Sequence, residues 1–203
     1  MARVLVSLVT HDESRDTERL LPTLFAQTYR DFELVAVDNR SEDGTRASLA
    51  AAKKLAPVPM EIVASRENLG FTGGHNVGIG KAVERGAEWV LVLNADVVLA
   101  PDYLETLLAD ALRPGREWVG AMTGKILRAD GPDLVPSTVV DTAGIRMTRS
   151  GRHFDVGAGE PDTGRWDRPA EIFGVSGCVA LYRVAALEDV KISTGWFDDD
   201  FFV

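Results

Sequence analysis

The feature that most constrains this chain is the alternation of short apolar runs with helical patterns through its first half. Four runs have the length and composition of buried strands: Ala2–Val9, Phe32–Val37, Glu61–Ala64 and Trp89–Leu93. Helical spacing follows each of them, around Leu20–Phe25 and over Gly44–Leu55, Gly73–Arg85 and Leu104–Leu112. This order predicts an α/β fold with a mainly parallel sheet flanked by helices.

Glycine and proline mark the expected helix boundaries. Pro22 lies inside the first helical pattern, so that helix is expected to kink there or to begin late. Gly86 is expected to cap the third helix, and Pro101 lies near the start of the fourth.

Composition limits the function classes. The 203 residues suit one domain, and 45% hydrophobic with 26% charged residues is typical of a soluble protein. A net charge of -9 argues against nucleic acid as a partner. The single cysteine, Cys178, excludes a disulfide framework and is expected to fill core space. No segment approaches the roughly 18 apolar residues of a membrane helix. We expect a cytoplasmic protein, and peripheral contact with the inner face of a membrane stays open.

The second half is less regular. Val119–Ile126 and Val139–Ile145 are candidate strands within a loop-rich insertion. Ile172–Phe173 and Cys178–Tyr182 are expected to return to the sheet. Residues 1–203 are therefore interpreted as a single domain.

Polar residues follow three of the predicted strands: Thr10, Asp38 and Asp96. Ligands of parallel α/β sheets bind at the carboxyl ends of the strands, so these side chains are expected to meet at one site. Asn94 and Asp96 offer the oxygen ligands that Mg²⁺ or Mn²⁺ prefers, and such an ion would neutralise a diphosphate. The triplet Asn94-Ala95-Asp96 is also compatible with a plain turn.

Two further segments carry candidate binding groups. Asp38 could accept a hydrogen bond from a pyrimidine N–H or a ribose hydroxyl, or could merely form a turn or cap. The glycine-rich segment Asn68–Asn76 opens the third helix and suits an anion or a ribose-phosphate edge. It is not a Walker loop, and His75 has no second His or Cys nearby for zinc.

Asp198, Asp199 and Asp200 stand between Trp196-Phe197 and Phe201-Phe202. Aromatic rings and carboxylates together suit a sugar site, and one of these carboxylates could act as a general base. The alternative is a frayed acidic terminus.

These pieces occur in an order that resembles bacterial family 2 glycosyltransferases, particularly the rhamnosyltransferase-like branch. The resemblance spans essentially the whole chain and rests on the ordered set: Leu8-Val9-Thr10, Val37-Asp38-Asn39-x-Ser41-x-Asp43-Gly44-Thr45, Glu67-Asn68-Leu69-Gly70-Phe71, Asn76-x-Gly78, Leu93-Asn94-x-Asp96, Gly174-x-Ser176-Gly177, Tyr182-Arg183 and Gly195-Trp196-Phe197-Asp198-Asp199-x-Phe201-Phe202.

The resemblance implies a GT-A fold, a UDP- or dTDP-sugar donor and a divalent cation. Residues 1–114 would form the nucleotide-binding half, and residues 115–203 an incomplete acceptor-side half. The implied roles are as follows: Thr10 and Asp38 contact the nucleobase or ribose, Asn68, Gly70 and Asn76 line the nucleoside pocket, Asp96 binds the metal, and Trp196, Asp198 and Asp199 border the acceptor. Asn94 replaces the first Asp of the family's Asp-x-Asp motif, and His11-Asp12 replaces an aromatic-Asn pair.

The implied reaction is a direct displacement that inverts the anomeric carbon, in the assembly of a polysaccharide or a lipid-linked glycan. The family's expected catalytic base lies in an aromatic-x-Glu-Asp element after Phe-Phe, whereas this sequence ends at Val203. We therefore expect the chain to bind nucleotide but to transfer sugar poorly.

Three alternatives are weighed against this interpretation. A sugar-1-phosphate nucleotidyltransferase should carry a glycine-rich, basic motif after the first strand, where this chain has the acidic Thr10–Glu13. A nicotinamide dehydrogenase is disfavoured because the glycine-rich segment Asn68–Asn76 has no Gly-x-Gly-x-x-Gly pattern and does not follow the first strand. A non-catalytic module that binds a sugar nucleotide remains open.

Overall fold

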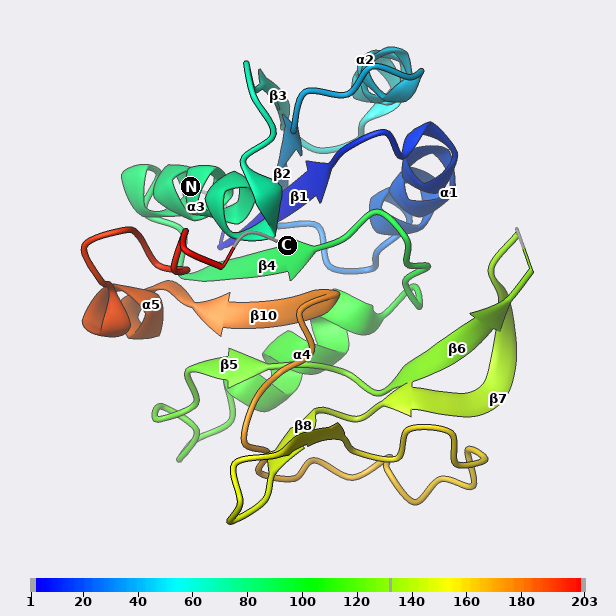
Figure 1. The fold of residues 1–203 in the computed structure, drawn as a ribbon, viewed down its shortest axis with the longest axis vertical. Helices are drawn as coiled ribbons and strands as arrows, with labels where there is room; N and C mark the ends of the chain where they lie inside the picture. Colours follow the sequence, from blue (N-terminus) through cyan, green and yellow to red (C-terminus); the bar gives the residue numbers. More distant parts are fainter. Residues whose placement is uncertain (1–2, 132, 202–203) are drawn as a thin grey trace.

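A computed structural model of the chain describes residues 3–131 and 133–201. Within these residues, six strands form one mixed sheet in the order β3-β2-β1-β4-β10-β5 (Figure 1). The strands are β1 (Val4–Thr10), β2 (Phe32–Asp38), β3 (Met60–Ala64), β4 (Trp89–Leu93), β5 (Ala121–Met122) and β10 (Val179–Arg183). Strands β1 to β4 are mutually parallel, and β10 runs antiparallel to β4 and β5. The predicted mainly parallel α/β sheet is confirmed. The expected first residue of the first strand, Ala2, lies outside the described residues.

The apolar runs become strands because both faces of the sheet are covered. Val4, Val6 and Leu8 of β1 belong to one core, and Leu5 belongs to the other, as a side-chain period of two requires. All five residues of β4 are buried. Such two-sided burial explains runs that are apolar throughout instead of alternating with polar residues.

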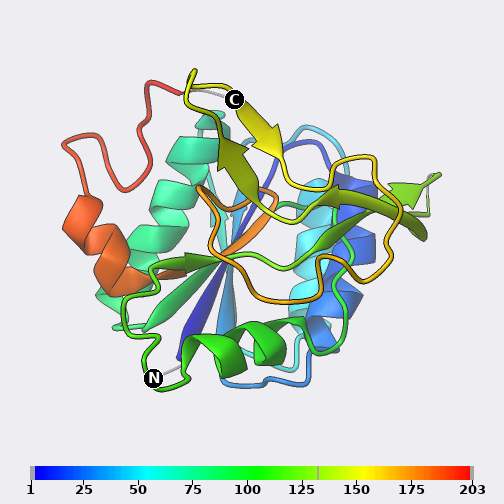
Figure 2. The same cartoon turned by 90° about the horizontal axis from the view of Figure 1, so that it is seen from below.

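Five helices lie around the sheet in the described residues: α1 (Ser14–Phe25), α2 (Thr45–Leu55), α3 (Gly70–Glu84), α4 (Tyr103–Ala111) and α5 (Val184–Val190). Buried leucines of α1, α2 and α4 share one core with β1, β2 and β4. Ile79 of α3 and Leu187 of α5 belong to the core on the opposite face. Figure 2 shows this division, with α3 and α5 on one side of the sheet and α1 and α2 on the other.

Two helix starts differ from the sequence prediction. Helix α1 already begins at Ser14 and carries Pro22 in its interior, since the buried Thr17, Leu20, Leu21 and Leu24 hold its apolar face on the sheet. Helix α3 begins at Gly70, whose φ of 66° is a left-handed conformation that suits glycine. The expected cap at Gly86 is confirmed by a φ of 67° and a bond from its N–H to the Val83 carbonyl of 3.1 Å.

The insertion after α4 contains two hairpins, β6 (Ile126–Asp130) with β7 (Val135–Thr142), and β8 (Ile145–Met147) with β9 (His153–Asp155). The first expected strand is reduced to β5, and the second is divided between β7 and β8. The expectation that Ile172–Phe173 returns to the main sheet is wrong. The Phe173 N–H instead donates to the Ile145 carbonyl of β8, at 3.0 Å. No helix among the described residues is long and apolar enough to cross a membrane.

Candidate functional site

Strand register brings the predicted polar residues to one edge of the sheet. Thr10 and Asp38 are paired residues at the carboxyl ends of β1 and β2. Leu8 of β1 pairs with Leu93 of β4, so Asn94 and Asp96 follow directly at the same edge. Thr10 and Asp38 are buried, Asn94 is half-buried and Asp96 is exposed. The rim formed by the carboxyl ends of β1, β2 and β4 is called the strand-end rim below.

Glu13, which sequence analysis did not single out, connects two sides of this rim. Burial raises the pKa of its carboxyl, bonds from the His11 N–H and the Thr10 hydroxyl lower it, and the negative charge of Asp96 raises it further. Glu13 and Asp96 stand on the loops after β1 and β4, which are neighbouring strands of the sheet. Two carboxylates are thus carried by this part of the rim, where a cation would relieve their repulsion.

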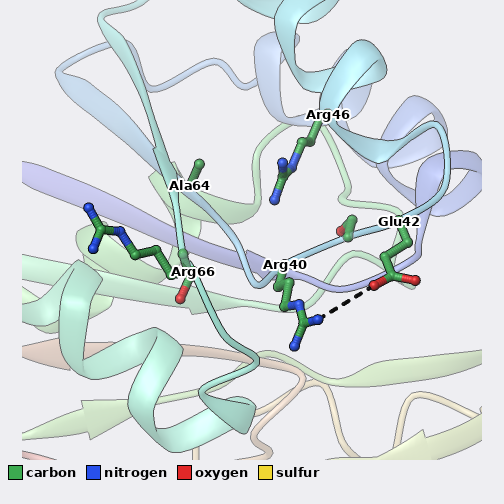
Figure 3. A pocket seen from close by; sticks show the side chains of 7 residues that line it. Arg40, Glu42, Arg46, Ala64 and Arg66 are labelled. Atoms are coloured by element: carbon green, nitrogen blue, oxygen red, sulfur yellow. Dashed lines mark ion pairs between the residues drawn. The ribbon is translucent and has the colours of Figure 1, made fainter.

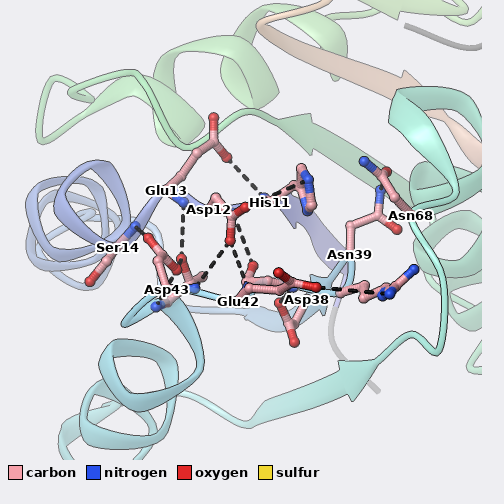
Figure 4. A network of polar contacts seen from close by, with 12 residues as sticks. His11, Asp12, Glu13, Ser14, Asp38, Asn39, Glu42, Asp43 and Asn68 are labelled. Atoms are coloured by element: carbon pink, nitrogen blue, oxygen red, sulfur yellow. Dashed lines mark hydrogen bonds and ion pairs between the residues drawn. The ribbon is translucent and has the colours of Figure 1, made fainter.

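A network of backbone-to-side-chain bonds ties the loop after β1 to the loop after β2 (Figure 4). Asp12, with a φ of 55°, accepts bonds at its Oδ1 from the N–H groups of Glu42, at 2.7 Å, and Asp43, at 3.2 Å. In return the Asp12 N–H donates to the Ser41 hydroxyl, at 3.0 Å, and the Glu13 N–H donates to the Thr45 hydroxyl, at 2.9 Å. The two loops consequently behave as one fixed wall of the rim.

Asp38 is held inside this wall. Its side chain is fully buried, and its Oδ1 accepts the Ser41 N–H at 2.9 Å. Its Oδ2 forms an ion pair with Arg46. Both carboxylate oxygens of Asp38 thus have protein partners. Of the ion pair, only Arg46 reaches the surface, where its side chain is 53% exposed.

Asn39 is the polar centre that the sequence analysis missed. Its N–H donates to the Thr10 carbonyl at 2.8 Å, and its amide nitrogen donates to Asn68 Oδ1 at 2.8 Å and to the Gly70 carbonyl at 3.0 Å. Its amide oxygen accepts the Leu69 N–H at 2.9 Å. Asn39 thereby joins three loops. Its signals in the sequence were its place directly after Asp38 at the end of a buried strand and its place in the family motif, and neither indicated this role.

Asn68 and Gly70 shape the loop that leads into α3. Asn68 Oδ1 accepts the Gly70 N–H at 2.9 Å as well as the Asn39 amide. The positive φ of Gly70 turns the chain into the helix. Both predicted residues therefore lie beside the ends of β1 and β2, on the loop that Asn39 anchors.

A pocket of about 490 Å³ opens beside the ends of β2 and β3 (Figure 3). Its walls are Arg40, Ser41, Glu42, Arg46, Ala64, Ser65 and Arg66. Three arginines line this one cavity in a chain of net charge -9, and in Figure 3 the Arg66 guanidinium group turns away from those of Arg40 and Arg46. Guanidinium groups bind phosphate oxygens and stack on aromatic rings, so the pocket suits an anionic or planar ligand. The sequence did not reveal it because the three arginines belong to different elements, Arg40 to the loop after β2, Arg46 to α2 and Arg66 to the loop after β3.

Helix α3 packs unusually close to β1. A Cβ at Gly78 would lie 2.0 Å from Ser7 Oγ, and one at Gly74 would lie 2.8 Å from a methyl group of Val9. Between them, His75 Nδ1 bonds to Ser7 Oγ at 2.9 Å. Burial lowers the pKa of His75 to about 3, so the ring is neutral. Gly74, from the predicted ligand-binding segment, and Gly78, just after it, serve the contact between helix and strand.

The predicted acceptor-side residues lie along the opposite side of α3. Asn76 bonds to Trp196, Phe197 and Asp199. Asp198 Oδ1 accepts bonds from the Thr194 hydroxyl and the Asp200 N–H, at 3.2 and 3.1 Å, and so forms a local turn. Phe202 and Val203 lie outside the described residues. The structure thus joins Asn76 to the aspartate segment and not to the arginine pocket.

The candidate metal position is the loop after β4. In the ranges 3–131 and 133–201, no group of three or more His, Cys, Asp or Glu side chains gathers as a metal site. Asp96 is nevertheless exposed, and Asn94 precedes it by two residues at the same edge. This donor set fits an ion that takes one or two protein oxygens and completes its shell with phosphate oxygens and water, as Mg²⁺ commonly does.

Comparison with solved structures identifies the fold. S. aureus TarS in complex with UDP-GlcNAc aligns with a TM-score of 0.60 and 21% identity, over 92% of this chain and 47% of that chain. GalNAc-T7 with UDP, GalNAc and Mn²⁺ aligns with a TM-score of 0.64 and 16% identity, over 92% of this chain and 35% of that chain. The mannosyltransferase PcManGT from Pyrobaculum calidifontis, with GDP-Man and Mn²⁺, aligns over 62% of this chain and 36% of that chain, with a TM-score of 0.52 and 26% identity. The chain is an α/β protein of the GT-A-like class.

Sequence comparison gives the family. The profile described as "Glycosyl transferase family 2" matches residues 6–191, and the chain belongs to this family. The galactofuranosyltransferase GlfT1 of Mycobacterium tuberculosis is 33% identical over 94 residues, 46% of this chain and 30% of the relative. An uncharacterized glycosyltransferase of Nostoc is 28% identical over 106 residues, 52% of this chain and 32% of the relative. The chain spans about a third of the length of these curated relatives.

Proposed function

We propose that this chain binds a nucleoside-diphosphate sugar at the strand-end rim and that the protein transfers the sugar to an acceptor hydroxyl with inversion. The observation that carries the proposal is the register of the sheet, which pairs Thr10 with Asp38 and places Asn94 and Asp96 at the same edge. Membership of family 2 supports the reaction class. The order of the motifs favours the rhamnosyltransferase-like branch, and residues 1–114 and 115–203 act as donor and acceptor halves of one domain.

The nucleoside end of the donor is assigned to the arginine pocket and the loop beside it. Arg46 takes over the contact expected of Asp38, because the Asp38 carboxylate is buried behind the guanidinium group. Arg66 offers a planar surface to a nucleobase. Asn68 and Gly70 border the ribose through the loop that Asn39 holds, and Thr10 forms the floor. We assign a pyrimidine nucleotide, UDP or dTDP. TarS, of the same fold, was solved with UDP-GlcNAc.

The diphosphate is assigned to the space between the loops after β1 and β4. Asp96, assisted by Asn94, would hold Mn²⁺ or Mg²⁺, which supplies charge neutralisation of the leaving diphosphate when it is bound. Both PcManGT and GalNAc-T7 were solved with Mn²⁺. Glu13 faces the same space and adds a second negative charge near the ion.

The acceptor is assigned to the segment of Trp196, Asp198 and Asp199. A tryptophan ring and carboxylates suit the face and the hydroxyl groups of a sugar. A polysaccharide or lipid-linked glycan acceptor fits the family resemblance, at the cytoplasmic face of a membrane. Neither Asp198 nor Asp199 is assigned as the proton acceptor, since both have protein partners. The residue that deprotonates the acceptor hydroxyl is therefore expected in the aromatic-x-Glu-Asp element of the family.

The test is a binding titration of this chain with UDP, dTDP, GDP and ADP, each with and without Mn²⁺. We expect selective binding of a pyrimidine nucleotide that Mn²⁺ strengthens at least about tenfold, as one added ion contact to a diphosphate would. Asp96→Ala should remove the effect of Mn²⁺ and leave the melting temperature of the free protein unchanged, because Asp96 is exposed.

Asp102→Ala is the matched control. It removes another exposed carboxylate, six positions further along and outside the rim, and should leave Mn²⁺-dependent binding intact. Binding that ignores Mn²⁺, or that Asp96→Ala leaves unchanged, would refute the assignment of the diphosphate. Tight donor binding without any turnover, once an acceptor is supplied to the full protein, would identify a binding module.

A further inference from the structure

We infer that Asn76 is a positioning residue that fixes Asp199 and the chain around it against helix α3. Only the description of Asp199 as an acceptor-side residue rests on the proposed function. The contacts themselves are independent of it. The inference gives Asn76 a different task from the nucleoside contact that its sequence motif suggests.

All four hydrogen-bonding positions of the Asn76 side-chain amide are used by one segment, residues 196–199. Its Oδ1 accepts the N–H groups of Trp196, at 3.0 Å, and Phe197, at 2.9 Å. Its Nδ2 donates to the Phe197 carbonyl, at 2.8 Å, and to Asp199 Oδ1, at 2.7 Å. An amide offers two donors and two lone pairs, so none is left for a nucleoside.

Gly195 adds an independent sign that the segment is built around this amide. Its φ is 142°, and a Cβ on it would lie 2.4 Å from Asn76 Nδ2 and 2.7 Å from Asn76 Cγ. Any larger residue at this position would push the segment away from Asn76. Glycine here allows the chain to pass directly over the amide.

The neighbouring contacts place the segment along one side of the helix. Thr72 donates its hydroxyl to the Phe201 carbonyl at 3.2 Å, and Gly80 faces the Trp196 ring. Thr72, Asn76 and Gly80 are spaced by four residues and form one stripe. Gly74 and Gly78 face β1 instead. Helix α3 therefore connects the strand that ends in Thr10 with the segment that carries Asp199.

This arrangement gives Asn76 a defined effect on Asp199. The bond from Nδ2 occupies Oδ1 of Asp199, and no hydrogen bond to its second carboxylate oxygen is found among residues 3–131 and 133–201. Because α3 packs closely on β1, the position of the carboxylate is set relative to the strand-end rim. Loss of the bond should misplace the carboxylate while the donor site stays intact.

The experiment uses a reciprocal exchange of side chains in the full chain. Asn76→Asp replaces the donor Nδ2 with an oxygen that repels Asp199. The double variant Asn76→Asp/Asp199→Asn restores a donor and an acceptor in the opposite order. Glu84→Gln, an exposed change further along α3, is the control. The readouts are amide hydrogen exchange of residues 195–199 and the Kd for UDP with Mn²⁺.

We expect Asn76→Asp to speed exchange in residues 195–199 by at least about tenfold, because both Nδ2 bonds are lost and one of them is charge-assisted. The double variant should return exchange to within about threefold of the starting protein, since one of the two Nδ2 bonds is recovered. Glu84→Gln should change nothing, and the UDP Kd should stay within about twofold in every variant.

Unchanged exchange in Asn76→Asp, or failure of Asp199→Asn to restore protection, would overturn the inference. A tenfold weaker UDP Kd with normal exchange would return Asn76 to the nucleoside pocket. If the starting protein binds no nucleotide at all, the proposed function fails, while the exchange data still decide the role of Asn76.

Discussion

Replacing Gly78 with alanine is a sharp test of how α3 is seated on β1. The added Cβ would lie 2.0 Å from Ser7 Oγ, 2.6 Å from Ser7 Cβ and 3.4 Å from Ser7 Cα. Rotating the Ser7 hydroxyl cannot relieve the contact with Cβ, so helix and strand must separate. The movement would also stretch the 2.9 Å bond between Ser7 and His75.

Two opposing terms set the magnitude. Alanine favours a helix interior over glycine by about 1 kcal/mol. Overpacking of a filled contact costs about 1–3 kcal/mol and more where backbone must move, and a stretched buried bond adds about 1 kcal/mol. We expect a net loss of about 1–3 kcal/mol in the free energy of unfolding. For a domain of this size that lowers the melting temperature by roughly 3–10 °C.

The assay is urea and thermal unfolding of Gly78→Ala beside Gly80→Ala. Gly80 is two residues further along the same helix, and its added Cβ would meet the Trp196 ring at 3.6 Å, an ordinary contact. Gly80→Ala should therefore be neutral or stabilising by up to about 1 kcal/mol. Equal stability of the two variants, or a gain in Gly78→Ala, would refute the close seating of α3.

Three further outcomes follow from the buried polar groups. Arg46→Ala should lower the free energy of unfolding by about 1–3 kcal/mol in urea titration, because Asp38 stays buried without its partner, and Asp38→Asn in the same chain should recover part of the loss. Asn39→Ala should weaken nucleotide binding about tenfold in calorimetry by loosening the loop before α3, and unchanged affinity would contradict the role of Asn39. The pKa of His75 is depressed to about 3 in the folded protein, so as pH falls the unfolded chain binds a proton on this ring before the folded protein does. The free energy of unfolding should therefore decrease as pH drops from 6.5 toward 3. His75→Phe should flatten that part of the stability profile in urea titrations.

The sheet could be predicted because burial on both faces leaves a direct mark on the sequence. Trp89–Leu93 is entirely apolar, and the structure has a strand with the same bounds. The polar residues after each strand then indicated the strand-end rim without any knowledge of distances. Helix α5 escaped notice because its seven residues, Val184–Val190, are too short to show a period. The hairpins of the insertion were obscured because β6, β8 and β9 are short and because few residues of any of the four strands are buried.

Side-chain direction is what the sequence could not supply. Asn76 stands in a glycine-rich motif at the start of a helix, which suggested a nucleoside contact, but the helix turns it toward residues more than a hundred positions away. Asp38 was placed correctly at a strand end, whereas its burial behind Arg46 depends on a long-range fit. Arg40 and Arg66 carried no pattern at all. Their common pocket exists only because β2 and β3 are neighbours.

A crystal structure of the chain soaked with UDP and Mn²⁺ would test the central assignment most directly. We predict electron density for the base beside Arg46 and Arg66, and for the diphosphate and its ion between Thr10 and Asp96. Nucleotide bound on any other surface, with Asp96 free of metal and phosphate, would contradict the account.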